Sequence, residues 1–267
     1  MSAPQELLST ARPGSEPRAP ARIGSLLLIL AVTPPLRWLV VRLTVPAGQA
    51  SRRTCGRCGV EVSPTGPGWT ALLPGGRCGR YRHRVGAVPY LLELCVAVAV
   101  VIVVLAAPTI PVMLAGLWWA GCAVPLAFID AQVHRLPDVL TLPAAAGVLV
   151  LLTVDAAASG SWDRLLSAAI CAIVSALVFL SLGLVLGSRG MGLGDTKLLF
   201  SLTALLGWWG WGSALGGVLL GFLGSGLAGV VLLASRRAHP QTQIPMGPFL
   251  IAGALLMFAL LAQAPSA

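Results

Sequence analysis

The sequence predicts an all-α integral membrane protein with about eight transmembrane helices. Hydrophobic residues make up 57% of the chain and charged residues only 10%, and the mean hydropathy is +0.87. A soluble domain typically carries about 25% charged residues, so these values exclude an ordinary soluble fold. Most apolar runs also approach the roughly 20 residues that a helix needs to cross a bilayer. No separate soluble domain of useful size is left over.

Eight apolar runs are candidate spans. The first is the weakest, because Arg37, Arg42 and two adjacent prolines interrupt it, and the count falls to seven if it does not insert. The sixth is short, which is typical of a tilted or partly interfacial helix. The candidates are residues 23–45, 86–107, 110–130, 139–157, 165–187, 197–209, 212–234 and 244–264.

Lysine and arginine concentrate in alternate loops. The loops 46–85, 131–138, 188–197 and 235–243 carry seven, one, two and two of them, twelve in all. The opposite side carries three in the N-terminal tail and Arg164 in a loop. Because the positively charged side usually faces the cytoplasm, we expect the first set of loops to be cytoplasmic. The net charge of +9 follows this topological pattern, so no nucleic-acid partner is expected.

Three aspartates fall at the predicted cytoplasmic ends of spans. Asp130 ends the third span, Asp138 begins the fourth and Asp195 begins the sixth. A carboxylate at the edge of a bilayer is costly, so it usually has a partner or a task. Two carboxylates held close together share a proton. The ionised one can then take a proton from water while the other donates one to a carbonyl oxygen, which is what aspartyl-type peptide hydrolysis requires.

Composition alone leaves two other readings open: helix-end aspartates that face water, and carboxylates that line an ion pathway. Gly192 and Gly194 leave little bulk beside the third aspartate, so an extended substrate backbone would be able to approach it. Lys197 either holds charge near the site or extends to lipid head groups, and we favour the second. Asp155 and Asp163, near the opposite face, are expected to be solvated helix-end charges.

Three motifs resemble those of the type IV prepilin peptidases. Residues 128–143, FIDAQVHRLPDVLTLP, resemble the family's first aspartate motif. Residues 190–197, GMGLGDTK, resemble its second, the GxGD segment that presenilin-type intramembrane proteases also carry. Residues 244–250, IPMGPFL, resemble the proline-glycine stretch that opens its last span. The resemblance is strong from about residue 78 to the C-terminus, and it implies a GxGD aspartyl protease-like bundle.

The resemblance also implies roles for individual residues. Asp130 and Asp195 match the family's catalytic pair. Asp138 follows Leu-Pro as in the family pattern, and it is either the second choice for the first catalytic position or an N-cap of the fourth span. Glu93 sits where the family keeps a glutamate, which would either bond neighbouring helices or serve a second activity.

The loop after the first span holds part of a metal-binding motif. Bacterial family members usually carry two CxxC pairs there, a spacing that suits tetrahedral zinc. Here Cys55 and Cys58 form the first pair, but only Cys78 of the second is present. His83, a few residues further on, would complete a Cys3His zinc site. The alternative is a set of reduced cysteines in a degenerate loop, since a cytoplasmic loop argues against a structural disulfide.

The first span departs further from the family pattern. Members that also N-methylate the new pilin terminus have a GSFLNV-type segment followed by RLP, of which only Gly24-Ser25, Arg42-Leu43 and Pro46 remain. Methylation, which alone would need S-adenosylmethionine, is therefore not expected, and the peptidase needs no cofactor. We divide the chain into a polar tail (1–22), a degenerate first span with the cysteine loop (23–85) and a transmembrane peptidase core (86–267).

The resemblance implies a multi-pass protein of the bacterial inner membrane with its active site facing the cytoplasm. We expect a membrane-embedded aspartyl endopeptidase that cuts the short basic leader from type IV prepilin-like or pseudopilin precursors. Two alternatives remain: a non-catalytic paralogue that acts in pilus or secretion assembly, and a proton-coupled transporter. Transporters commonly show internal repeats and carboxylates near the bilayer midplane. Neither feature is present in this sequence.

Overall fold

The computed structural model describes residues 32–46, 51–79, 81–186, 192–236 and 244–263. In these residues the protein is all-α, with two isolated bridges, Thr54–Glu61 and Arg77–Arg84, and no strand. The first helix covers residues 32–43. The helices that follow are α2 (Leu91–Ala106), α3 (Ile110–Val133), α4 (Asp138–Ser159), α5 (Trp162–Leu186), α6 (Leu193–Leu206), α7 (Trp211–Ala234) and α8 (Gly247–Leu261), with short 3-10 turns at Trp69–Leu72 and Gly207–Trp209.

Each predicted span overlaps one of these helices, which confirms the all-α membrane fold. Four of them, α3, α4, α5 and α7, are long and apolar enough to cross a bilayer, and α2 and α8 are shorter apolar helices. With 14 residues, α6 is as short as its apolar run indicated. Residues 23–31 of the first predicted span, like the tail 1–22, lie outside the described part of the chain.

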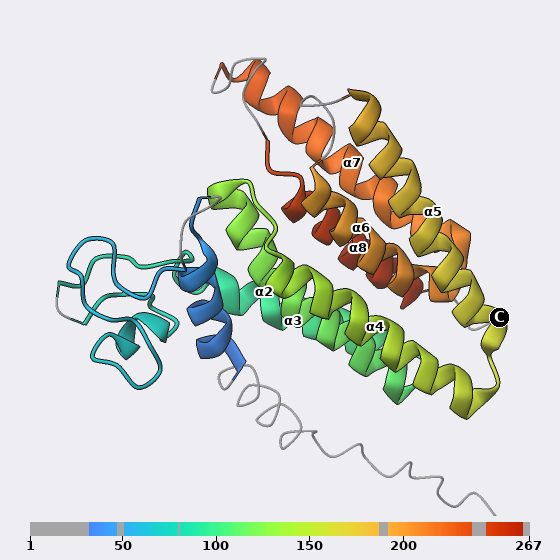
Figure 1. Ribbon diagram of the computed structural model, residues 1–267, viewed down its shortest axis with the longest axis horizontal. Coiled ribbons are helices and arrows are strands. Elements are labelled where there is room, and N and C mark those ends of the chain that lie inside the picture. The colour runs from blue at the N-terminus through green and yellow to red at the C-terminus, as the bar shows by residue number, and fades with distance from the viewer. Residues whose placement is uncertain (1–31, 47–50, 80, 187–191, 237–243, 264–267) are drawn as a thin grey trace, which may run out of the picture.

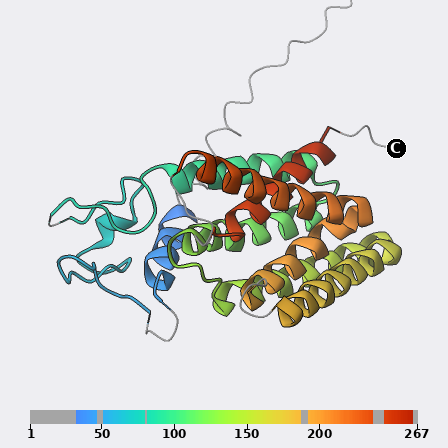
Figure 2. The same ribbon diagram turned by 90° about the horizontal axis from the view of Figure 1, so that it is seen from above.

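The central helix of the bundle is α6. It contacts α3, α4, α5, α7 and α8, and Figures 1 and 2 show α2, α3 and α4 running side by side next to the group formed by α5 to α8. Most of its residues are buried, on every side of the helix. A helix that is enclosed in this way lacks the polar face of a surface helix. The structure therefore surrounds α6 with protein.

Two hydroxyl groups fix the rotation of α6 about its axis. The indole Nε1 of Trp119 on α3 donates to Ser201 Oγ at 3.2 Å, and Ser175 Oγ on α5 lies 2.7 Å from Thr203 Oγ1. Because an unpaired polar group in an apolar interior is costly, these contacts favour one rotation of the helix. That rotation determines where the side chains of the first turn of α6 point.

Helices α7 and α8 pack with their backbones almost in contact. A Cβ atom added to Gly253 would lie 2.4 Å from the Gly221 nitrogen and 2.6 Å from the Gly217 oxygen. Small residues permit this close approach, which is common between helices in membranes. The contact fixes α8, and with it the start of that helix at Gly247.

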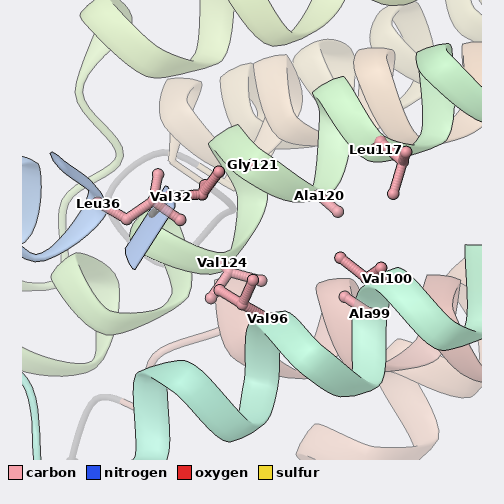
Figure 3. A pocket seen from close by; sticks show the side chains of 9 residues that line it. All are labelled: Val32, Leu36, Val96, Ala99, Val100, Leu117, Ala120, Gly121 and Val124. Carbon is pink, nitrogen blue, oxygen red and sulfur yellow. The ribbon is translucent and has the colours of Figure 1, made fainter. Parts of the chain in front are cut away.

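The first helix packs against the bundle. Together with α2 and α3 it encloses a small apolar pocket of about 160 Å³ (Figure 3). Leu36 is buried there and Val40 is fully buried one turn later. The pocket is lined by Val32, Leu36, Val96, Ala99, Val100, Leu117, Ala120, Gly121 and Val124.

Candidate active site and cysteine cluster

Asp130 and Asp195 come together at one end of the bundle. Asp130 lies in the last turn of α3 and is 5% exposed, and Asp195 lies in the first turn of α6 and is partly buried. The two carboxylates are close enough for their charges to interact. α3 ends just beyond Asp130, where His134 adopts a left-handed conformation with φ of 51°. The two aspartates were expected on the same membrane face, and the structure brings both to one end of the bundle.

The start of α8 holds Asp130 in place. The backbone N–H of Gly247 donates to Asp130 Oδ2 at 2.9 Å. A Cβ atom at position 247 would lie 2.9 Å from the same oxygen and 3.2 Å from Cγ, so only glycine fits without a shift. The motif around this glycine was visible in the sequence, but its contact with an aspartate 117 positions away was not.

The glycines of the second motif let α6 approach its neighbours. A Cβ atom at Gly194 would lie 2.9 Å from Leu136 Cβ, in the segment that joins α3 to α4. At Gly192 it would lie 3.5 Å from Asp195 Oδ2. Gly194 therefore lets the start of α6 approach the segment between α3 and α4 closely, and Gly192 leaves space beside the Asp195 carboxylate. Gly190 and Met191 lie outside the described residues.

Asp138 and Lys197 form an ion pair at the same end of the bundle. Lys197 Nζ on α6 lies 2.6 Å from Asp138 Oδ1 on α4, and both side chains are exposed. Asp138 is the first residue of α4, the N-cap is Pro137, and no side chain caps the helix. The capping role considered for Asp138 is therefore wrong. Lys197 was expected to extend to lipid head groups. It instead pairs with Asp138, a carboxylate on the neighbouring helix α4.

Glu93 bonds a neighbouring helix, which was one of its two expected roles. Its carboxylate pairs with Arg37 of the first helix, with Nε–Oε1 and Nη2–Oε2 distances of 2.6 Å and 2.8 Å.

The two remaining aspartates that the sequence singled out lie towards the far end of the bundle. Asp163 is exposed, as expected. Asp155 is 4% exposed and accepts a hydrogen bond from Thr109 at 2.5 Å. The expectation that Asp155 is a solvated helix-end charge is therefore wrong.

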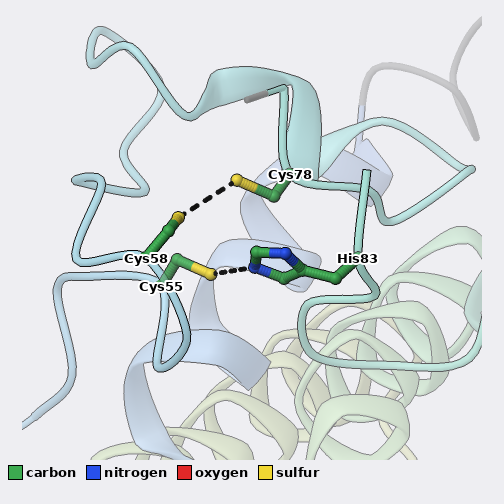
Figure 4. A group of neighbouring side chains, drawn as sticks. All are labelled: Cys55, Cys58, Cys78 and His83. Carbon is green, nitrogen blue, oxygen red and sulfur yellow. Dashed lines mark hydrogen bonds between the residues drawn. The ribbon is translucent and has the colours of Figure 1, made fainter. Parts of the chain in front are cut away.

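The three loop cysteines and His83 form one cluster (Figure 4). Cys55 Sγ lies 2.8 Å from His83 Nε2, and Cys58 Sγ lies 3.5 Å from Cys78 Sγ. All four atoms lie within 4.8 Å of one another. The loop that carries them projects from the bundle beside the first helix (Figure 2).

Two similar turns build the cluster. In the first, the Cys55 N–H donates to Val60 O at 2.8 Å and the Gly59 N–H donates to Cys55 O at 2.9 Å. In the second, the Cys78 N–H donates to His83 O at 3.0 Å, and the Arg82 N–H donates to Cys78 O at 2.8 Å. The second turn therefore repeats the first, with a histidine at the position that Val60 occupies. This repeat explains how a histidine reaches the place of the missing cysteine.

The cluster fits a tetrahedral zinc ion. With Zn–S bonds near 2.3 Å, the ligand sulfurs of such a site lie about 3.8 Å apart, close to the distances of this cluster. Three thiolates and one imidazole are a common set for structural zinc. The Val60 amide lowers the pKa of the Cys58 thiol, but burial and the thiols of Cys78 and Cys55 outweigh it, and the net shift is upward. Without a metal ion this thiol therefore stays protonated near neutral pH.

Comparisons with known proteins agree with the motifs. The profile of the type IV leader peptidase family matches residues 114–234, from α3 to the end of α7. The prepilin leader peptidase/N-methyltransferase of Pseudomonas aeruginosa is 35% identical over 213 residues, which cover 74% of this chain and 68% of that protein. A protein of the same description from Aeromonas salmonicida is 35% identical over 209 residues, covering 76% and 69%.

A further relative of that description, from Aeromonas hydrophila, is 37% identical over 183 residues, covering 67% of this chain and 60% of that protein. No solved structure matches the chain significantly. The matched length includes both aspartate motifs, and the helices carry them to one end of the bundle. The chain therefore belongs to the type IV leader peptidase family, and it is a multi-pass bacterial membrane peptidase of that family.

Proposed function

We propose that the protein is an aspartyl endopeptidase that cuts the leader peptide from type IV prepilin-like or pseudopilin precursors at the cytoplasmic face of the membrane. A role in type IV prepilin processing follows from the family. The excess of Lys and Arg in the loops at this end supports the cytoplasmic location. The observation that carries the proposal is the meeting of Asp130 and Asp195, from two separate helices, at one end of the bundle.

In this proposal the two aspartates share one proton. The ionised carboxylate takes a proton from a water molecule as the water attacks the scissile carbonyl carbon, and the protonated carboxyl donates to the carbonyl oxygen. The Gly247 N–H holds Asp130 Oδ2, which fixes the orientation of that carboxyl group. A fixed orientation lowers the reorganisation that the reaction requires. We assign Gly192 and Gly194 the role of leaving room beside Asp195.

We also propose that Cys55, Cys58, Cys78 and His83 hold a zinc ion. The bound ion would cross-link the two turns of the loop. It has no part in cleavage, because four protein ligands close its coordination shell.

For the segment 1–85 we propose that methyl transfer to the new pilin terminus has been lost, since the parts that carry the family's methylation motifs depart from the pattern.

Processing of a co-expressed prepilin tests the main proposal. Asp130→Asn and Asp195→Asn should each abolish leader removal, measured as the mass of the pilin, while both variants still insert into the membrane. Asp163→Asn is the matched control, because this exposed aspartate lies towards the other end of the bundle, and it should process normally. Normal processing by Asp130→Asn or Asp195→Asn would refute the dyad. Absence of processing by the unaltered protein with every prepilin of its host would favour a non-catalytic paralogue.

A further inference from the structure

A second, polar pocket lies between the cysteine loop and the bundle. It has a volume of about 300 Å³ and is bordered by the loop, the C-terminal end of the first helix and the end of α3. Three arginines line it: Arg52, Arg57 and Arg84. Thr44 and Gln132 add a hydroxyl and an amide group. The pocket therefore has hydrogen-bond donors around one hollow.

The three guanidinium groups have no carboxylate partner among the described residues. The ion pairs found there are Arg37–Glu93 and Lys197–Asp138, and none of the residues that line the pocket is acidic. Like charges gathered in a concave site with protein walls concentrate a positive potential. Such a site favours an anion and disfavours a cation, so the sulfonium group of S-adenosylmethionine is unsuited to it.

The pocket lies at the ends of two helices, where we expect the membrane surface. Val41 and Thr44, at the end of the first helix, line it from one side, and Gln132, in the last turn of α3, lines it from another. Helices of a membrane protein end near the head groups, and basic pockets between them on the cytoplasmic side bind anionic lipid head groups. Arginine is suited to this because its planar fork matches the oxygens of a phosphate group.

We propose that Arg52, Arg57 and Arg84 form a binding site for a phosphate group, which the head group of an anionic phospholipid supplies. The bound phosphate joins the cysteine loop, which carries all three arginines, to the ends of the first helix and α3. It also offsets positive charge close to the end of α3, where Asp130 lies. Cys55 of the metal cluster also lines the pocket, so the phosphate site adjoins that cluster. The two aspartates do not line the pocket, and the proposal does not depend on the function proposed above.

Native mass spectrometry of the full chain in detergent tests the site. The probes are phosphatidylglycerol, phosphatidylcholine and inorganic phosphate. The pocket variant is Arg52→Gln/Arg57→Gln/Arg84→Gln. The matched control is Arg53→Gln/Arg77→Gln/Arg82→Gln, which removes the same charge from exposed positions of the same loop that do not line the pocket. Circular dichroism and limited proteolysis establish that both variants keep the fold of the loop.

We expect the unaltered protein to retain phosphatidylglycerol in preference to phosphatidylcholine. The pocket variant should bind it at least about tenfold more weakly, given the contribution of each arginine near a charged surface, and the control variant should bind it normally. Binding of inorganic phosphate that is lost in the pocket variant, together with no preference between the two lipids, would support the phosphate site and assign it to a soluble ligand. Equal weakening in both triple variants would overturn the proposal. So would a protein that neither prefers phosphatidylglycerol to phosphatidylcholine nor binds inorganic phosphate.

Discussion

Arg37 and Glu93, which lie 56 positions apart, form a largely buried bidentate ion pair between the first helix and α2. Arg37 is 1% exposed. Its remaining donors bind the carbonyl oxygens of Pro74, Ala87 and Val88, at 2.9 Å, 3.2 Å and 3.3 Å. One guanidinium group therefore joins the first helix, the cysteine loop and the start of α2.

Replacing either member of this pair should destabilise the protein strongly. Glu93→Gln leaves the buried guanidinium without a counter-charge, and Arg37→Lys cannot reach the same set of acceptors. Removing one partner of a buried ion pair costs about 3–5 kcal/mol. We expect a clear fall in the midpoint of thermal unfolding in detergent, together with faster proteolysis of the loop. An unchanged midpoint in both variants would contradict the structural role that we assign to Arg37.

The ion pair between Asp138 and Lys197 should behave differently. Both side chains are exposed, and exposed pairs typically contribute about 0.2–1 kcal/mol. Asp138→Asn should therefore leave the unfolding midpoint almost unchanged and retain at least part of the cleavage activity. Complete loss of cleavage with an intact fold would instead make Asp138 the partner of Asp195.

Gly247→Ala should impair cleavage more than folding. The added methyl group would lie 2.9 Å from Asp130 Oδ2, so the carboxylate or the start of α8 must move. We expect at least a tenfold fall in kcat for leader removal, because a shift of a catalytic group by about 1 Å costs on the order of a hundredfold in rate. Gly226→Ala in α7 is the control, since a Cβ atom there meets nothing within 4 Å. Equal rates for the two alanine variants would show that the fit around Asp130 is unimportant.

The cysteine cluster should hold one zinc ion per chain. Elemental analysis of freshly purified protein measures it, and Cys55→Ser or His83→Ala should lose the metal because each removes one of four ligands. Cys122→Ser serves as the control, since this cysteine lies in α3, outside the cluster. Metal-free protein with an intact loop would contradict the zinc proposal. The cysteines would then be reduced thiols in a degenerate loop.

The mature pilin should carry a free, unmethylated N-terminal amine. The proposed cleavage requires the meeting of α3 and α6, whereas the family's methylation motifs lie in the first span and the loop, where this chain departs from them. Mass spectrometry of the processed product decides the question. A gain of one methyl group that is lost on mutating the loop 46–85 would show that methyl transfer survives.

The positions of the helices were predictable because long apolar runs have few alternatives in a membrane. The Cys3His cluster was predictable as well, since a short loop carries all four residues. The contacts that organise the site were not. Arg37 interrupts an apolar run and counted against insertion of the first span, yet it is buried because Glu93 and three backbone carbonyls surround it.

The start of α2 also depends on contacts that the sequence does not reveal. The apolar run begins at residue 86, but the helix begins at Leu91, because the carbonyls of Ala87 and Val88 bind Arg37 and Tyr90 adopts a left-handed conformation with φ of 61°. Likewise, the expected start at Ile244 shifts to Gly247 in α8, where the backbone meets Asp130. Partners distant in sequence determine where these two helices begin, and the hydrophobic pattern of the sequence does not reveal such partners.

The enclosure of α6 determines which molecule must change shape during cleavage. A helix held by protein on every side, with Ser201 and Thr203 bonded to two different neighbours, cannot turn or slide alone without breaking several contacts at once. If Asp195 acts as proposed, it is carried by a helix whose later turns are held by contacts with the neighbouring helices α3 and α5. A peptide bond within a helix is shielded by its own backbone hydrogen bonds. We therefore expect a substrate that is helical at the bond to be cut to unwind there, and precursors whose helices fray easily at that point to be processed fastest in a competition between them.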